Sequence, residues 1–139
     1  MAGTLREPVP VRTRTEGTED LFIVVCASGF ENSARARSAL MFAALAATGG
    51  YRTVLYCIQN AVDIMVRGSV EKNERLQPGV PSLAQRLNEA LEAGVEIHCC
   101  TQTMANKNLT EVDLIDGARA EGAMNLIVLA AQARGTISF

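Results

Sequence analysis

The sequence predicts an α/β fold: three layers, with a mainly parallel sheet of four or five strands and helices on both faces. Short apolar segments rich in β-branched residues alternate with longer segments of helical character. Unbroken apolar segments are typical of strands covered on both faces, and the alternation predicts right-handed β–α–β crossovers. The chain has 139 residues, the size of one domain. We therefore expect a polar N-terminal extension over residues 1–20 and a single domain over residues 21–139.

The first half of the domain is expected to supply two strands. The apolar residues 21–27 predict the first strand, and residues 51–58 predict the second. Between them, residues 28–32 form a turn that leads into an alanine- and leucine-rich helix over residues 33–48. Beyond its first two turns this helix is apolar all round, so we expect a second cover besides the sheet, most simply a subunit interface. Residues 60–68 predict a short helix and turn.

The segment before the third strand contains the clearest helix of the chain. Residues 71–81 are polar, end with two prolines and predict a loop. Residues 82–94 predict an amphipathic helix that begins at a serine cap and ends at a glycine. Residues 95–100 then predict the third strand, and residues 101–109 a connection that leads away from it.

The last segment predicts one more helix and two more strands. Thr110 and Asp113 have the spacing of a capping box, which predicts a helix that ends near Gly122. The apolar residues 124–130 predict a fourth buried strand, and residues 135–139 predict a short edge strand.

Composition excludes several function classes. Thirteen basic and fifteen acidic residues give a net charge of −2, and no nucleic-acid-binding motif is present. No glycine-rich nucleotide-binding loop follows the first strand. The longest strongly apolar stretch, residues 39–47, is far shorter than the roughly 20 residues of a membrane helix, and no secretory signal is visible. We therefore expect a cytoplasmic protein without a membrane anchor.

Four cysteines are the main chemical feature of the sequence. They include no C-x-x-C pair, and His98 is the only histidine, which argues against structural zinc. Adjacent α-carbons lie about 3.8 Å apart, shorter than the roughly 4.4 Å that disulfides need, so Cys99 and Cys100 are expected to be thiols. Cys26 and Cys57 are interpreted as small buried hydrophobic residues.

Cys100 is the strongest candidate for a nucleophile. Side chains alternate along a strand, so His98 and Cys100 share one face and Cys99 lies on the other. As the last residue of its strand, Cys100 is expected to be the more exposed thiol, and amides after it would lower its pKa from about 8.5. A purely structural role for Cys100 stays open. His98 is either a base or ligand, about 6.5 Å back along the strand, or a packed side chain.

The carboxyl ends of parallel strands are where ligands gather in open α/β sheets. Three segments reach this edge in the predicted topology, after the first, second and third strands. For Glu31 and Asn32, a turn-and-cap role explains the residues equally well. The side chains expected to line a cleft here are Phe30, Glu31, Asn32, Asn60 and Gln102.

Two stretches resemble a known family. Residues 94–104, Gly-Val-Glu-Ile-His-Cys-Cys-Thr-Gln-Thr-Met, and residues 113–117, Asp-Leu-Ile-Asp-Gly, resemble the DsrE/DsrF-like sulfur-relay family. The resemblance implies a flavodoxin-like or closely related fold, assembly into trimers or hexamers, and no metal, flavin or nucleotide cofactor. It also implies that Cys100 accepts sulfane sulfur as a persulfide. Cys99 stands where many members have a small apolar residue, so it is a helper thiol, a resolving thiol or merely a small residue.

The function that the resemblance implies is that of a sulfur carrier or sulfurtransferase. Its partners would be TusA-like or rhodanese-like sulfur donors and acceptors, and its assembly a homotrimer. A second hypothesis is a non-catalytic scaffold or binding subunit, which the apolar helix over residues 33–48 would suit. A third is a small-ligand or metal site formed by His98 and the thiols.

Overall fold

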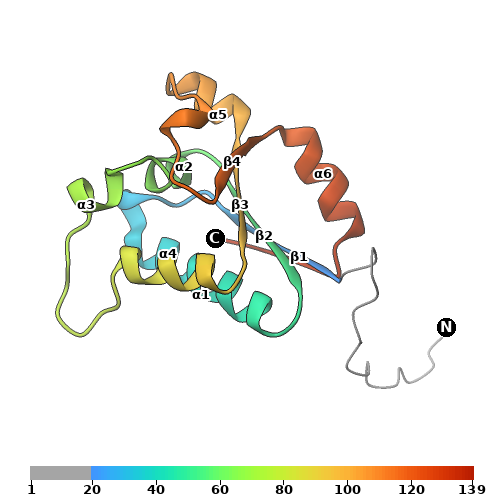
Figure 1. Cartoon of the computed structure of the whole chain (residues 1–139), viewed down its shortest axis with the longest axis horizontal. Helices are drawn as coiled ribbons and strands as arrows, with labels where there is room; N and C mark the ends of the chain where they lie inside the picture. The colour runs from blue at the N-terminus through green and yellow to red at the C-terminus, as the bar shows by residue number, and fades with distance from the viewer. Residues whose placement is uncertain (1–19) are drawn as a thin grey trace.

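A computed structural model describes residues 20–139, which contain a five-stranded, entirely parallel sheet (Figure 1). The strand order is β4-β3-β2-β1-β5, which confirms the predicted α/β class. Of the expected N-terminal extension, all but Asp20 lies outside the described residues. The strands are β1 (Leu21–Cys26), β2 (Arg52–Cys57), β3 (Glu96–Cys100), β4 (Ala118–Glu121) and β5 (Gly135–Ser138).

The direction of the crossovers decides which face each helix covers. The steps from β1 to β2 and from β2 to β3 move the same way across the sheet, so right-handed crossovers place their helices on one face. The step from β4 to β5 returns across the sheet, and its helix lies on the other face (Figure 1). The helices are α1 (Ser33–Thr48), α2 (Asn60–Ile64), α3 (Ser69–Asn73), α4 (Leu83–Glu92), α5 (Thr101–Asn106) and α6 (Ala123–Gln132), with 3₁₀ turns η1 (Phe30–Asn32) and η2 (Glu111–Asp113).

The two faces of the sheet carry apolar clusters of different size. The larger cluster lies between the sheet and helices α1 and α4. The smaller one joins Leu129 of α6 to Leu21 and Ile23 of β1 and Val54 of β2. The helix α6 therefore covers mainly β1 and leaves the same face of β3 and β4 to polar side chains.

The expected second cover of α1 is provided by α4. The two helices pack against each other over the same face of the sheet. Part of α1 still faces outward, with Phe42 42% and Leu45 58% exposed. The ring of Phe42 stacks on Phe139 with the centroids 5.4 Å apart. The helix α4 thus covers part of the apolar surface of α1.

The predicted helix over residues 110–122 is wrong, although its capping box is present. The Asp113 carboxylate accepts a hydrogen bond from the backbone N–H of Thr110 at 2.8 Å, but the box opens only the turn η2. The next residues are held extended, because Ile115 donates its N–H to the carbonyl of Met65. Gly117, at φ +92°, then turns the chain into β4.

The predicted strand over residues 124–130 is also wrong, because this segment forms α6. A short apolar run fits a buried strand and a partly covered helix equally well. Only Ile127 and Val128 in it are β-branched, and both lie on the exposed side of the helix. Within residues 20–139, no helix is both long and apolar enough to cross a bilayer.

Candidate functional site

Cys100 is the last residue of β3 and the N-cap residue of α5. Its exposed fraction is 7%, which is more than the 0% of Cys99 but less than the sequence predicted. The reason is that residues 101–106 form a helix rather than an open connection, and this helix packs back onto β3 and β4. The thiol is therefore close to the surface and largely covered.

Several polar groups lie within hydrogen-bonding reach of the sulfur of Cys100. The backbone N–H groups of Gln102 and Thr103 and the hydroxyls of Tyr56 and Thr103 are its hydrogen-bond partners. Burial raises the pKa of the Cys100 thiol, but these hydrogen bonds together outweigh it, so the pKa lies below its ordinary value. Hydrogen bonds to the charged form favour a thiolate, the form in which cysteine attacks electrophiles.

The Thr103 hydroxyl is held in place from the neighbouring strand end. The backbone N–H of Gln59, two residues beyond β2, donates to Oγ1 of Thr103 at 3.1 Å. Because this bond occupies the oxygen as an acceptor, the hydroxyl proton is available for the sulfur of Cys100. Gln59 has φ +51° and ψ −128°, a backbone conformation that non-glycine residues rarely adopt. Strained residues of this kind are over-represented at functional sites.

The other three cysteines form a row on the opposite face of the sheet. Cys26 pairs with Cys57 across β1 and β2, and Cys57 pairs with Cys99 across β2 and β3. All three are buried in the larger core cluster, as expected for Cys26 and Cys57. A hydrogen bond with Cys99 and burial raise the pKa of Cys57, and burial raises that of Cys26. The structure thus brings Cys99 together with Cys57 and separates it from the face that carries Cys100.

His98 lies on the face of Cys100, as expected from the alternation of side chains, but it makes no catalytic pair with the thiol. It is buried, and neither ring nitrogen has a hydrogen-bond partner. Burial, together with the charge of Arg119, lowers the pKa of His98, so the ring is neutral at pH 7. The Oε1 of Glu96 lies 3.8 Å from Nε2 of His98. The structure therefore places His98 as a packed side chain.

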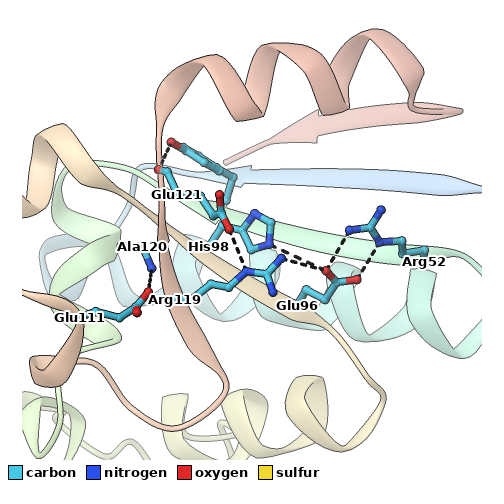
Figure 2. Close-up of polar contacts among 8 residues, drawn as sticks. Arg52, Glu96, His98, Glu111, Arg119, Ala120 and Glu121 are labelled. Atoms are coloured by element: carbon cyan, nitrogen blue, oxygen red, sulfur yellow. Dashed lines mark hydrogen bonds and ion pairs between the residues drawn. The ribbon is translucent and has the colours of Figure 1, made fainter.

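A network of charged side chains covers His98. Arg52 contacts the two carboxylate oxygens of Glu96 at 2.8 and 3.1 Å, and Arg119 approaches the same carboxylate at 3.7 Å (Figure 2). Arg119 also pairs with Glu121 at 3.0 Å. The hydrogen bond from Arg52 lowers the pKa of Glu96, and this effect exceeds the opposing effect of burial. Two arginines and two glutamates thus balance their charges beside His98.

A shallow, open depression lies beside the strand ends. Of the predicted cleft residues it contains only Asn60; Gln59, Thr103, Asn106 and Lys107 complete its lining. Asn32 instead caps α1 by accepting the N–H of Arg35 at 3.2 Å, and Glu31 accepts the N–H of Gly29 at 2.8 Å.

The other two predicted cleft residues also lie outside this lining. Phe30 packs against the larger core cluster, and Gln102 contributes its backbone amide to Cys100 while its side chain is exposed. The depression and the thiol share Thr103.

Sequence reasoning missed Tyr56 and Thr103. Tyr56 lies in the middle of a buried strand, where its hydroxyl requires a partner, and this was a usable signal. In the sheet Tyr56 is paired with His98, and His98 lies on the same face of β3 as Cys100. Thr103 had no comparable signal, because its position depends on the start of α5.

The sequence of this chain matches a known protein family over most of its length. The model of the DsrE/DsrF-like family covers residues 20–139, all of the described part. The chain belongs to the DsrE/DsrF-like family. Both quoted stretches lie inside the matched region, which confirms the resemblance predicted from the residues around Cys100.

One protein sequence and two solved structures are similar to this DsrE/DsrF-like protein, and the two structures agree with it in fold. An uncharacterised protein of Methanocaldococcus jannaschii is 28% identical over 118 residues, which is 85% of this chain and 98% of the relative. The crystal structure of the ychN protein of E. coli matches with a TM-score of 0.67 at 18% identity, covering 87% of this chain and 99% of that one. A conserved protein of unknown function from Bacteroides thetaiotaomicron matches with a TM-score of 0.62 at 11% identity, over 86% and 95% of the two chains.

The third hypothesis, a metal or small-ligand site formed by His98 and the thiols, gains no support from the geometry. Within residues 20–139, no three histidine, cysteine, aspartate or glutamate side chains gather in an arrangement that would hold a metal ion. His98 and the row of buried thiols lie on opposite faces of the sheet.

Proposed function

We propose that this protein is a sulfur carrier that holds sulfane sulfur as a persulfide on Cys100 and passes it between partner proteins. One observation carries the proposal: Cys100 ends its strand with two backbone amides and two hydroxyls as hydrogen-bond partners of its sulfur, and these lower the pKa of the thiol. Membership of the DsrE/DsrF-like family supports the chemistry.

The transfer needs no redox cofactor. The Cys100 thiolate attacks the terminal sulfur of a donor persulfide, R–S–SH, and forms a new S–S bond. The S–S bond of the donor breaks, and R–S⁻ leaves with the electron pair, so no net oxidation occurs. The persulfide on Cys100 then meets an acceptor thiolate, which attacks its terminal sulfur, and the Cys100 thiolate is released.

The partners that suit this step are proteins with a sulfur-bearing cysteine, such as TusA-like carriers and rhodanese-like donors, acting in the cytoplasm. The exposed surface next to Cys100 is polar and includes Gln102, Asn60 and Asn106. The charges next to it are paired within the chain, as in Lys107 with Asp63 at 3.1 Å. A partner must approach closely, because the sulfur is largely covered. We further propose assembly as a homotrimer, as the family resemblance implies.

Mass spectrometry of the intact protein tests the carrier function. The protein is incubated with inorganic polysulfide and, separately, with a persulfidated rhodanese, and then weighed without reductant. The wild type and Cys99→Ser, the matched control, are expected to gain the mass of one sulfur atom, and Cys100→Ser is expected to gain none. Equal sulfur uptake by Cys100→Ser, or loss of uptake in Cys99→Ser alone, would contradict the assignment.

The alternative function is a non-catalytic scaffold within a sulfur-relay complex. The small exposed fraction of Cys100 and the outward apolar residues of α6 favour it. A wild-type protein that takes no sulfur from either donor, while Cys100 also resists small alkylating reagents, would decide for this alternative.

A further inference from the structure

Tyr56 reaches across β3 on the face that carries Cys100. It starts from β2, where it is paired with His98 of β3, and its ring stands edge-on to the His98 ring with the centroids 6.5 Å apart. Its hydroxyl donates to the backbone carbonyl of Glu121 in β4 at 2.9 Å. Glu121 is the residue paired with Cys100 across β3 and β4. The tyrosine thus spans from one neighbour of β3 to the other and brings its hydroxyl to the level of Cys100.

The phenol proton has two competing acceptors. Tyr56 is fully buried, so its hydroxyl must find partners inside the protein. The Glu121 carbonyl is one acceptor, and the sulfur of Cys100, which hydrogen bonds to the same hydroxyl, is the other. A neutral thiol is a weak acceptor, so the proton goes to the carbonyl. A thiolate is a charged acceptor that forms the stronger hydrogen bond, so ionisation of Cys100 draws the proton to sulfur.

We propose that Tyr56 is a catalytic residue whose hydroxyl turns from the Glu121 carbonyl to the Cys100 sulfur whenever that sulfur becomes anionic. This inference rests on the proposed carrier function. In loading, the anion exists before the attack on the donor. In delivery, the acceptor thiolate attacks the terminal sulfur of the persulfide, the Cys100–S bond breaks, and the Cys100 sulfur leaves with the electron pair. A donor that stabilises this leaving thiolate speeds delivery, because thiols of lower pKa leave faster.

The geometry distinguishes Tyr56 from the other donors to the thiol. The amides of Gln102 and Thr103 are fixed in the backbone, and the Thr103 hydroxyl is oriented by Gln59. Only the Tyr56 hydroxyl has a second acceptor within the protein that can take its proton back. This difference suits a sulfur that alternates between a charged thiolate and an uncharged disulfide-type atom.

The chain provides a matched control. It has two tyrosines, and Tyr51 is exposed just before β2, where its ring contacts Phe22 at 5.6 Å. The rate of alkylation by iodoacetamide is measured against pH for the wild type, Tyr56→Phe and Tyr51→Phe. Tyr56→Phe is expected to shift the midpoint of the profile to higher pH and to slow alkylation at pH 7 about tenfold, as for one lost hydrogen bond to a charged group. Tyr51→Phe is expected to match the wild type.

A second measurement does not require the Tyr56→Phe variant to fold. Tyr51→Phe protein is produced with 3-fluorotyrosine, which places the more acidic phenol at position 56 alone. A better hydrogen-bond donor is expected to move the alkylation midpoint to lower pH, opposite to the effect of phenylalanine. Unchanged midpoints with 3-fluorotyrosine and, where it folds, with phenylalanine would overturn the inference.

Sulfur delivery provides the final comparison. Persulfidated wild type and Tyr56→Phe are mixed with a small thiol, and loss of the extra sulfur is followed by intact mass. Delivery by Tyr56→Phe is expected to be about tenfold slower at equal pH. Unchanged delivery would overturn the catalytic role of Tyr56. Alkylation requires no sulfur, so a normal Tyr56 effect on alkylation in a protein that never takes up sulfur would reject the carrier function and not the hydrogen bond.

Discussion

Cys99 and Cys100 are neighbours in the chain but lie on opposite faces of β3. Cys99 belongs to the larger apolar core and hydrogen bonds with Cys57, whereas the sulfur of Cys100 is surrounded by amides and hydroxyls near the surface. The alternation of side chains along a strand makes this separation unavoidable while β3 is intact. The two cysteines therefore differ in their surroundings and are expected to differ in reactivity, although they are adjacent in the chain.

We predict that Cys100 is the single fast-reacting thiol of the folded protein. Cys26, Cys57 and Cys99 are expected to react with iodoacetamide at least about a thousandfold more slowly, because a reagent reaches them only after unfolding. The measurement is intact mass against time, with the modified residue located by peptide mapping. In denaturant all four thiols are expected to react alike, which serves as the control. A second fast thiol in the folded protein would contradict the prediction.

The Thr103 hydroxyl is predicted to support the Cys100 thiolate. Thr103→Val keeps the backbone N–H and the shape of the side chain but removes the hydroxyl. Because that hydroxyl lowers the pKa of Cys100, its loss should raise the pKa and slow alkylation at pH 7 by about fivefold to tenfold.

Two variants are the controls for this experiment. Thr103→Ser should retain most of the rate, because serine keeps the hydroxyl that accepts from Gln59. Thr101→Val changes an exposed threonine at the start of the same helix and should leave the rate unchanged. Equal slowing by Thr101→Val and Thr103→Val would mean that the effect comes from α5 as a whole and not from one hydroxyl.

The sequence predicted the elements up to Cys100 better than most of those after it. The first three strands, α1 and α4 follow from long apolar or amphipathic segments with clear caps, such as Ser82, which accepts the N–H of Gln85 at 3.0 Å. After Cys100 the local signals conflicted with the tertiary structure. The capping box at Thr110 is real, yet hydrogen bonds with the segment after α2 and pairing with β3 hold the following residues extended. Local propensity cannot anticipate such distant partners.

The sequence predicted which residue is the candidate nucleophile, but it did not predict the residues that surround its sulfur. The strand-end position of Cys100 follows from the apolar pattern of residues 95–100. The partners of its sulfur come from two separate segments, β2 and the start of α5, which meet only because β2 is adjacent to β3 and α5 starts directly after β3. Glu31 and Asn32 bond backbone amides at the turn and at the start of α1. This is the turn-and-cap role that their sequence position allowed as the alternative to lining a cleft.

Glu96 is predicted to contribute a pH-dependent part of the stability. Its pKa is lowered in the folded state, chiefly by the hydrogen bond from Arg52, so its contribution is present above its unfolded value of 4.5. The contribution is lost as the pH falls through the lowered folded pKa. Because both side chains are about one-third exposed, we expect Glu96→Gln to lower the free energy of unfolding at pH 7 by about 1 kcal/mol.

Urea unfolding of the wild type and Glu96→Gln at pH 7 and at about pH 3 provides the measurement. The difference between the two proteins should shrink at the lower pH. Glu92→Gln, at the exposed end of α4, is the control and should change stability by less than about 0.5 kcal/mol at either pH. A difference for Glu96→Gln that stays constant or grows on acidification would show that the pair with Arg52 does not stabilise the fold.

Two exposed apolar positions of nearly equal exposure test where copies of the chain meet. Leu45 on α1 is 58% exposed and Ile127 on α6 is 60% exposed. The sequence favoured α1 as the interface, but α4 already covers much of it, whereas Met124, Ile127 and Val128 form an apolar stripe on α6 that no other element in residues 20–139 covers. We therefore predict that Ile127→Lys, and not Leu45→Lys, dissociates the proposed homotrimer.

Sedimentation velocity at micromolar concentration measures this directly, with circular dichroism to show that both variants stay folded. A lysine at the centre of an apolar interface is buried without a partner, a cost that a weakly held trimer does not survive. Dissociation by Leu45→Lys alone would assign the interface to α1. If the wild-type protein sediments as a monomer, the proposed trimer is wrong. The apolar stripe on α6 would then be a surface for a different partner.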